Sequence, residues 1–383
     1  MRKSTINTLL LSTLFFLFVK STVSMALEID AVAGYDSNPY KLSTPHTEST
    51  YTLVKINHSG KQKYPDKAEL QYSLGITNQF YESNSSDADT HRLNARVRWI
   101  ERFKIGNKSA SLLSTADIRM ERRTYFSQTQ RKVAETSKGD SLADRFDYDS
   151  VKLATEFTYR FDKYKSLSMF SYLYFRNYVE DYEDLGLESL DYTEFGLQPT
   201  FRYKTEDDFY ARAFLFLRLR DYDDLQDDDE NGKNIEGSYL DYEFTGFGLL
   251  LQKPISDKIQ LKLYTNGYQA RDKASGYRDL NYRKTELSLT YNVEDRQTLK
   301  LSGNCYCRDY LMNSARPPES ETGDAGRKRD GCFAELSYTE PLDIWKKDKL
   351  SWQAKATTGH EKNSDDALNY YRSTFEIGLG YQF

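Results

Sequence analysis

The sequence predicts an all-β protein: a transmembrane, antiparallel, up-and-down β-barrel of about sixteen strands with an N-terminal signal peptide. Three observations carry this prediction. Polar and apolar residues alternate along many segments, the connections alternate between long and short, and an amphipathic segment ends the chain. Of the 383 residues, 14% are aromatic and 29% are charged. Disordered chains are poor in aromatic residues, so this composition excludes wholesale disorder.

The N-terminus has the features of a secretory signal peptide. Arg2 and Lys3 form a basic segment, Leu9–Val19 is apolar, and Ser24-Met25-Ala26 is a cleavage sequence. We therefore expect residues 1–26 to be a signal peptide and residues 27–383 to form the barrel domain. A single membrane anchor is the alternative interpretation, but the apolar stretch is short for a span.

Alternation with a period of two predicts the strands, because successive side chains of a strand point to opposite faces. In residues 211–220, alanine and leucine alternate with arginine and phenylalanine. No apolar run of about 18 residues occurs, which excludes a bundle of membrane helices. The expected strands cover residues 27–35, 50–58, 68–81, 91–103, 109–124, 147–161, 166–178, 190–203, 209–222, 238–252, 259–270, 281–293, 298–310, 331–340, 349–361 and 370–383.

The connections between these strands alternate in length. The longer ones include 125–146, 223–237 and 311–330, and the shorter ones include 162–165 and 204–208. This alternation is typical of a barrel that closes on itself in a membrane, where lipid cannot hydrogen-bond an open sheet edge. A large secreted sandwich or propeller is the alternative, and it predicts shorter strands without this asymmetry.

The final strand resembles that of a known group of proteins. Phe375, Ile377, Leu379, Tyr381 and Phe383 share one face and end the chain in an aromatic residue. This pattern resembles the terminal strand of bacterial outer-membrane β-barrel (porin-like) proteins, which the barrel assembly machinery reads. The resemblance implies the outer membrane of a Gram-negative bacterium, with lipid, lipopolysaccharide and that machinery as partners.

The first strand carries a second resemblance. The segment 34–38, Gly-Tyr-Asp-Ser-Asn, is similar to the opening of barrels associated with exopolysaccharide export or surface-lipoprotein assembly. This resemblance covers only residues 33–40. It implies the pore of a polysaccharide export system as an alternative function.

With apolar residues outward, the other face of each strand is expected to line the lumen. Basic residues outnumber acidic ones there, and the acidic ones are expected to include Asp241 and Glu243. A barrel of about sixteen strands can hold water, so unpaired arginines would favour anions and tyrosines would offer stacking faces to sugar rings. The candidate pore-lining residues are Arg92, Arg96, Arg98, Arg176, Arg212, Arg218, Arg220, Tyr172, Tyr174 and Tyr264.

These patterns predict a porin-like channel for the passive passage of hydrophilic solutes, anionic or sugar-type. The alternatives are the export pore and a structural or adhesive barrel whose lumen is closed by loops. The formal net charge of −5 argues against a nucleic-acid partner. The sequence leaves the identity of the solute and the oligomeric state open.

Neither catalysis nor a cofactor is expected. The chain has four histidines, and no nucleophile–base pair can be drawn from their spacing. The acidic segment 227–232 fits the first half of a calcium loop, with Asp227, Asp229 and Asn231 as candidate ligands. Ser238 stands where such a loop has its bidentate glutamate. The alternative is therefore a solvated acidic loop that divalent cations bridge to lipopolysaccharide.

Three cysteines occur late in the chain. Cys307 and Cys332 bracket one expected hairpin loop, and export to an oxidising compartment favours a disulfide between them. A free, lipid-facing thiol is the alternative. Cys305 and Cys307 form a C-x-C pair, a poor zinc spacing without two further ligands nearby.

Overall fold

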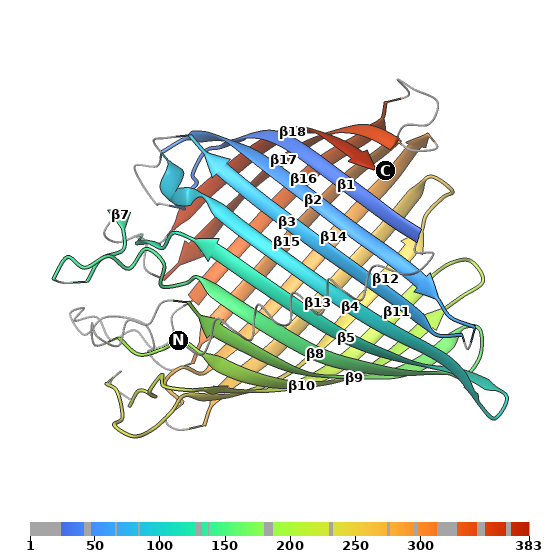
Figure 1. Ribbon diagram of the computed structural model, residues 1–383, viewed down its shortest axis with the longest axis horizontal. Helices are drawn as coiled ribbons and strands as arrows, with labels where there is room; N and C mark the ends of the chain where they lie inside the picture. The colour runs from blue at the N-terminus through green and yellow to red at the C-terminus, as the bar shows by residue number, and fades with distance from the viewer. Residues whose placement is uncertain are drawn as a thin grey trace.

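The computed structural model is a single closed β-barrel (Figure 1). Sixteen antiparallel strands pair in chain order, and the last pairs with the first. Among the described residues, no helix is long and apolar enough to cross a membrane. The structure describes residues 24–41, 47–65, 67–82, 85–127, 132–136, 138–179, 187–229, 233–273, 276–294, 297–311, 328–342, 349–364 and 369–382.

The barrel strands are long, and two minor elements lie in the connections. A 3-10 turn, η1, covers Ser86–Ala88, and β6 (Phe126–Ser127) pairs with β7 (Lys132–Val133). The barrel strands are β1 (Ser24–Asp36), β2 (Ser49–Lys63), β3 (Glu69–Tyr81), β4 (Thr90–Ile105), β5 (Lys108–Arg123), β8 (Tyr148–Arg160), β9 (Lys165–Tyr178), β10 (Tyr192–Lys204), β11 (Tyr210–Tyr222), β12 (Asp241–Pro254), β13 (Ile259–Asp272), β14 (Leu280–Glu294), β15 (Gln297–Tyr310), β16 (Lys328–Pro341), β17 (Lys349–Asn363) and β18 (Tyr370–Gln382).

The predicted fold class is confirmed, and each expected strand corresponds to one barrel strand. The largest difference is in β2, which continues to Lys63 although alternation ends near His58. The polar residues 59–63 remain paired with β3, so backbone pairing rather than side-chain alternation determines where β2 ends. β1 begins at Ser24, before the expected cleavage site; residues 1–23 lie outside the described residues, and the signal peptide stays a prediction.

The outer surface of the barrel is apolar. Leu215, Phe247 and Ile377 are 62%, 56% and 51% exposed, and they point away from the lumen on three different strands. Exposed apolar side chains on most strands fit lipid as their surroundings, and barrel closure pairs the backbone groups that lipid could not satisfy. The fold is therefore a transmembrane barrel.

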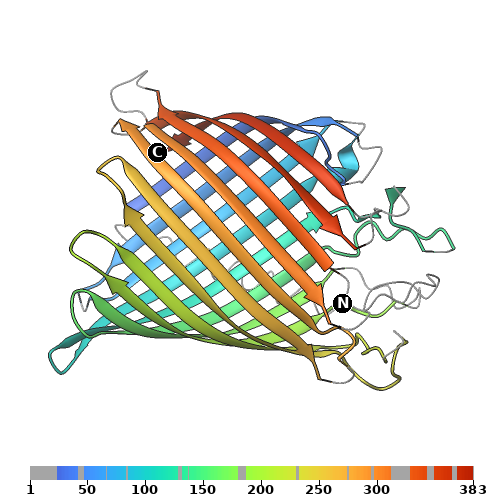
Figure 2. The ribbon, with the colours of Figure 1, turned by 180° about the vertical axis from the view of Figure 1, so that it is seen from behind.

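The two ends of the barrel differ. The connection that contains β6 and β7 projects from one end, whereas the tight turn 161–164 lies at the other, together with the end of β18 (Figures 1 and 2). The predicted alternation of long loops and short turns thus separates the longer connections from the shorter ones in space.

A buried carboxylate closes the seam between β1 and β18. Asp36 has no exposed surface, and it accepts hydrogen bonds from Arg372 Nε at 3.0 Å and from the Tyr81 hydroxyl at 2.9 Å. The arginine lies on β18 and the tyrosine on β3. One side chain therefore ties three strands together at the rim that carries the long loops.

The neighbours of Asp36 strengthen the same seam. Asn38 donates from Nδ2 to the Tyr371 carbonyl at 3.0 Å. Gly34 faces the ring of Tyr51, and a Cβ at position 34 would lie 2.3 Å from its Cζ, so no larger residue fits there without a shift. The segment 34–38 that resembles export barrels thus acts here in closing the barrel.

Candidate functional site

Every predicted pore-lining residue lies on the inward face of its strand. On β11, Arg212, Arg218 and Arg220 lie on the face opposite Leu215, which points outward. The pairing of β11 with β10 and β12 identifies the inward face of those strands in turn. The residues on β4, β9 and β13 share that face through their pairing partners. Their part in conduction stays a prediction.

One side of the lumen carries paired charges. On β4, Arg92 Nε lies 3.1 Å from Glu121 Oε2, and Arg96 forms an ion pair with Asp117. Both acids are on the neighbouring strand β5, and Glu121 also pairs with Arg119, so ion pairs offset only part of the positive charge on this wall. Arg98, further along β4, has no carboxylate partner among the described residues, and its Nε is unsatisfied.

Arg220 on β11 is also neutralised. Its Nη2 lies 2.7 Å from Glu194 Oε2 on β10, and the Tyr172 hydroxyl donates to the same carboxylate at 2.5 Å. A desolvated carboxylate with two donors holds its partners in place, so this group stiffens the wall. Arg220 is therefore a weaker source of free positive charge than the sequence predicts.

Other cations on the β8–β15 side have no carboxylate partner among the described residues. Arg212, Arg218 and Arg308 each have an Nε with no hydrogen-bond acceptor. Arg218 Cζ lies 4.6 Å from the Phe244 ring centroid, and Lys152 Nζ lies 3.9 Å from that of Tyr172. Aromatic faces attract cations without cancelling their charge, so this wall remains positive.

Aromatic rings form a row beside these cations. Tyr268 and Tyr282 are stacked with centroids 4.8 Å apart, Tyr282 and Tyr306 are 6.2 Å apart, and Tyr306 and Phe333 are 6.5 Å apart. Phe216 extends the row to β11, 6.2 Å from Tyr268. With Phe244 of β12, whose ring centroid is 5.9 Å from that of Tyr268, the row runs from β11 to β16.

The cations and rings enclose a cavity of about 590 Å³ in the lumen. Its wall includes Arg212, Arg218, Arg308 and Lys152, together with Asn266 of β13, which the sequence did not single out. Tyr172 and Tyr264, both predicted, also line it. The arrangement provides positive charge, aromatic faces and unsatisfied polar atoms in one place.

The expected face of β12 is wrong. Asp241 and Glu243 point outward, because register places Tyr242 opposite the inward Arg220. Phe244 is 8% exposed and points inward, whereas Phe247 points outward. Apolar residues occupy both faces of this strand, so alternation alone did not determine which face is outside.

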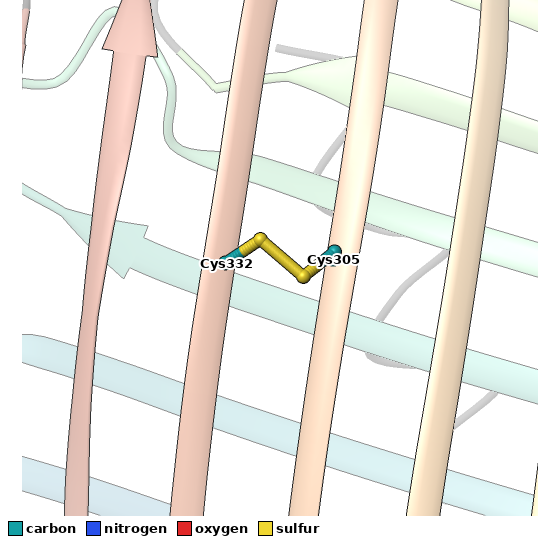
Figure 3. The surroundings of a disulfide bond; sticks show 2 residues. All are labelled: Cys305 and Cys332. Carbon is teal, nitrogen blue, oxygen red and sulfur yellow. A yellow bond between two sulfur atoms is a disulfide. The ribbon is translucent and has the colours of Figure 1, made fainter.

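The predicted Cys307–Cys332 disulfide is also wrong. The bond joins Cys305 to Cys332, whose Cα atoms are 4.1 Å apart (Figure 3). Register places these two residues directly opposite each other on β15 and β16, whereas Cys307 lies opposite Asp330. All three cysteines point outward, so the direction of the side chains alone could not show which two form the disulfide.

Alkylation tests this pairing. In denatured but unreduced protein, we expect iodoacetamide to modify Cys307 alone, because the other two sulfurs are in the disulfide. Cys307→Ala should abolish modification before reduction and leave the disulfide intact in a peptide mass map. A map that links Cys307 to Cys332 in the unmodified protein would contradict the register of β15 and β16.

The acidic connection between β11 and β12 does not assemble a metal site in its described part. Asp228 forms an ion pair with Arg278 at 2.6 Å, and Asp229 accepts from the backbone of Lys233 at 3.0 Å. Burial raises the pKa of Asp227, with a further contribution from the charge of Asp272. Asn231 lies outside the described residues, which contain no metal-ligating group of three His, Cys, Asp or Glu.

The described histidines do not meet. His58, His91 and His360 belong to β2, β4 and β17, and all three point outward. Their ring partners are Tyr72, Phe80 and Tyr371, respectively. His46 lies outside the described residues.

Comparisons with known proteins concern the fold. No protein-family model matches the chain, and no curated protein matches its sequence. The structure is similar to OccK1 (OpdK) of Pseudomonas aeruginosa, at a TM-score of 0.47 and 8% identity over 94% of this chain and 98% of that one. It is similar to an anion-selective porin from Comamonas acidovorans, at 0.45 and 10% over 95% and 100%. For OmpT, an outer membrane protein of Vibrio cholerae, the values are 0.45 and 12% over 95% and 99%.

Proposed function

We propose that the protein is a porin-like channel in the outer membrane of a Gram-negative bacterium, through which small hydrophilic solutes pass passively with a preference for anions. The observation that carries this proposal is the lumen wall between β8 and β15. Arg212, Arg218 and Arg308 face a cavity there without carboxylate partners among the described residues. Outer-membrane lipid and lipopolysaccharide would surround the apolar belt.

Charge in the lumen should outweigh charge at the rim. Semi-buried charges in a confined pore are screened less than exposed ones, and selectivity is set where the path is narrowest. The acidic loop near Asp227 opposes this preference by attracting cations to the mouth. An anion selectivity that weakens as salt rises is therefore the expected balance.

Conductance of the purified, refolded protein in planar bilayers tests the proposal. A steady current with a reversal potential displaced toward that of chloride in a KCl gradient supports it. The alternative export pore predicts no current until a loop is displaced, and a structural barrel with a filled lumen predicts none. A cation-selective open channel would contradict the assignment of the β8–β15 wall.

Surface labelling tests the orientation. We expect epitope tags inserted in 125–146, 221–237 or 311–330 to be labelled on intact cells, because long connections of such barrels face outward. Tags at 162–165 or 204–208 should be labelled only after the membrane is permeabilised. Labelling of the short turns alone on intact cells would reverse the orientation.

A further inference from the structure

The hairpin of β4 and β5 extends beyond the neighbouring strands at the end of the barrel that carries the short turns (Figures 1 and 2). Pairing of β4 with β3 ends at Ile100, and pairing of β5 with β8 begins at Ala110. The two strands of the hairpin pair with each other further, as far as Ile105 and Lys108. Residues 101–105 of β4 are therefore paired on one edge only, and no described strand covers their other edge.

An uncovered strand edge presents backbone donors and acceptors to which another strand can add. We infer that residues 101–105 form a docking edge for a separate periplasmic protein, of which an extended segment with alternating acidic and apolar side chains adds as a further strand. The inference goes beyond the proposed channel and rests on it only for the orientation, which places the short turns in the periplasm.

The docking edge is held in shape by its own hairpin. The turn between the two strands consists of Gly106 and Asn107, and Gly106 has a φ of 59°, in the left-handed region that glycine adopts at little cost. Tight two-residue turns fix the register of a hairpin. The docking edge is thus already extended before a partner arrives, which lowers the entropic cost of binding.

The outward face of the docking edge is apolar and uncovered. Phe103 and Ile105 are 40% and 47% exposed. The ring centroid of Phe103 is 6.5 Å from that of Phe157 on β8, which is exposed as well. Side chains of an added strand lie beside those of its neighbour on each face, so alternate apolar side chains of the partner would cover Phe103 and Ile105.

The inward face of the docking edge is basic. Arg102 lies 3.4 Å from Glu69, whereas Lys104 has no carboxylate within ion-pair distance among the described residues. Glu101, the one acid of the edge, is on the outward face, where its carboxylate accepts a hydrogen bond from an indole N–H at 2.7 Å. Acidic side chains on the corresponding face of an added strand would complement Lys104.

The same charges disfavour a second copy of this chain as the partner. Two identical edges that pair antiparallel around Phe103 would place Arg102 of one copy opposite Lys104 of the other. Like charges directly opposite on adjacent strands are destabilising, and lysine on an edge commonly protects it against self-association. The docking edge therefore favours a partner segment of the opposite charge.

Fluorescence anisotropy with labelled peptides tests this inference on the folded protein in detergent. The first probe is a short peptide of alternating glutamate and valine, the second has lysine in place of glutamate, and the third is the first with every peptide nitrogen methylated. We expect the first to bind at least about tenfold more tightly than either of the others, because charge and backbone donors both contribute. Equal binding of the first and third probes, or no binding of the first, would overturn the inference.

Charge reversal at the docking edge supplies a matched comparison. Lys104→Glu should weaken binding of the glutamate peptide about tenfold and strengthen that of the lysine peptide. Lys258→Glu makes the same charge change in the exposed turn between β12 and β13, at the same end of the barrel, and should change neither. Equal losses in both variants would show that the net charge of this end, rather than the docking edge, attracts the peptide. Heat-modifiable migration on gels verifies folding.

A nitroxide at position 105 distinguishes a protein-docking edge from a lipid anchor. Ile105→Cys, labelled in a Cys307→Ala background and reconstituted in vesicles, reports which molecules collide with this position. We expect collisions with a water-soluble nickel complex to exceed those with oxygen, because the hairpin extends out of the bilayer. The reverse order would place Phe103 and Ile105 in lipid and contradict the docking edge.

The outcomes distinguish this inference from the proposed function. An anion-selective current without binding of the glutamate peptide leaves the channel intact and removes the docking edge. Binding of the peptide to a protein that conducts no current keeps the docking edge and removes the passive channel.

Discussion

Replacement of Arg212, Arg218 and Arg308 together by serine is expected to weaken the anion selectivity of the channel strongly. These residues carry most of the unpaired positive charge of the cavity wall, so their removal leaves only Lys152 as an unpaired cation there. In a KCl gradient, the reversal potential should shift toward that of potassium. The shift should be larger at low salt than at high salt, because screening weakens it.

The choice of these three arginines follows from their surroundings. Arg220 is also a candidate pore-lining residue of β11, but Glu194 neutralises it, so removal of Arg220 tests an ion pair rather than a free charge. Serine at Lys138, Lys163 and Lys258 removes the same formal charge from connections outside the lumen and should leave selectivity unchanged. Equal shifts in both triple variants would mean that net charge, rather than the wall, determines selectivity.

Asp36→Ala is expected to cause the largest loss of stability in the barrel. The change leaves the Arg372 guanidinium without its buried partner at the seam and removes the acceptor for Tyr81. Breaking a buried ion pair from one side costs about 3–5 kcal/mol, and Arg372 is only 28% exposed, so solvent compensates little. Urea unfolding in detergent, followed by tryptophan fluorescence, measures the loss.

Asp30→Ala is the matched control for this experiment. Asp30 lies on the same strand and the same face, without an ion pair among the described residues, so its removal should cost less than about 1 kcal/mol. Asp36→Asn keeps the shape of the acceptor and should be intermediate. Similar midpoints for Asp36→Ala and Asp30→Ala would show that closure of the seam does not depend on the ion pair.

The sequence predicted the architecture because each strand faces lipid on one side and the lumen on the other, which imposes alternating apolar and polar residues. On β11 the rule is unambiguous, since arginines and leucines cannot share a face. On β12 it fails: Phe244 and Phe247 point to opposite sides, and only pairing with Arg220 distinguishes them. Inward aromatic residues are the physical reason, because the lumen wall is itself partly apolar.

Contacts between distant parts of the chain were beyond sequence reasoning. Arg372 is 336 residues from Asp36, and no local pattern relates them. The cysteine pairing needed the register of β15 on β16, where a shift of two residues would exchange Cys305 for Cys307. Individual arginines were found, but which of them lack acids depended on the neighbouring strands.

The unpaired arginines are concentrated on one side of the lumen, where Arg212, Arg218 and Arg308 line a single cavity. In the proposed channel, an anion held beside Arg218 and Arg308 would occupy the β8–β15 half and leave the half that contains the ion-paired Arg92 and Arg96 for water and small ions. A saturating solute should therefore lower the current without abolishing it. The current that remains should be less anion-selective than that of the empty channel, since acids offset part of the positive charge on that side.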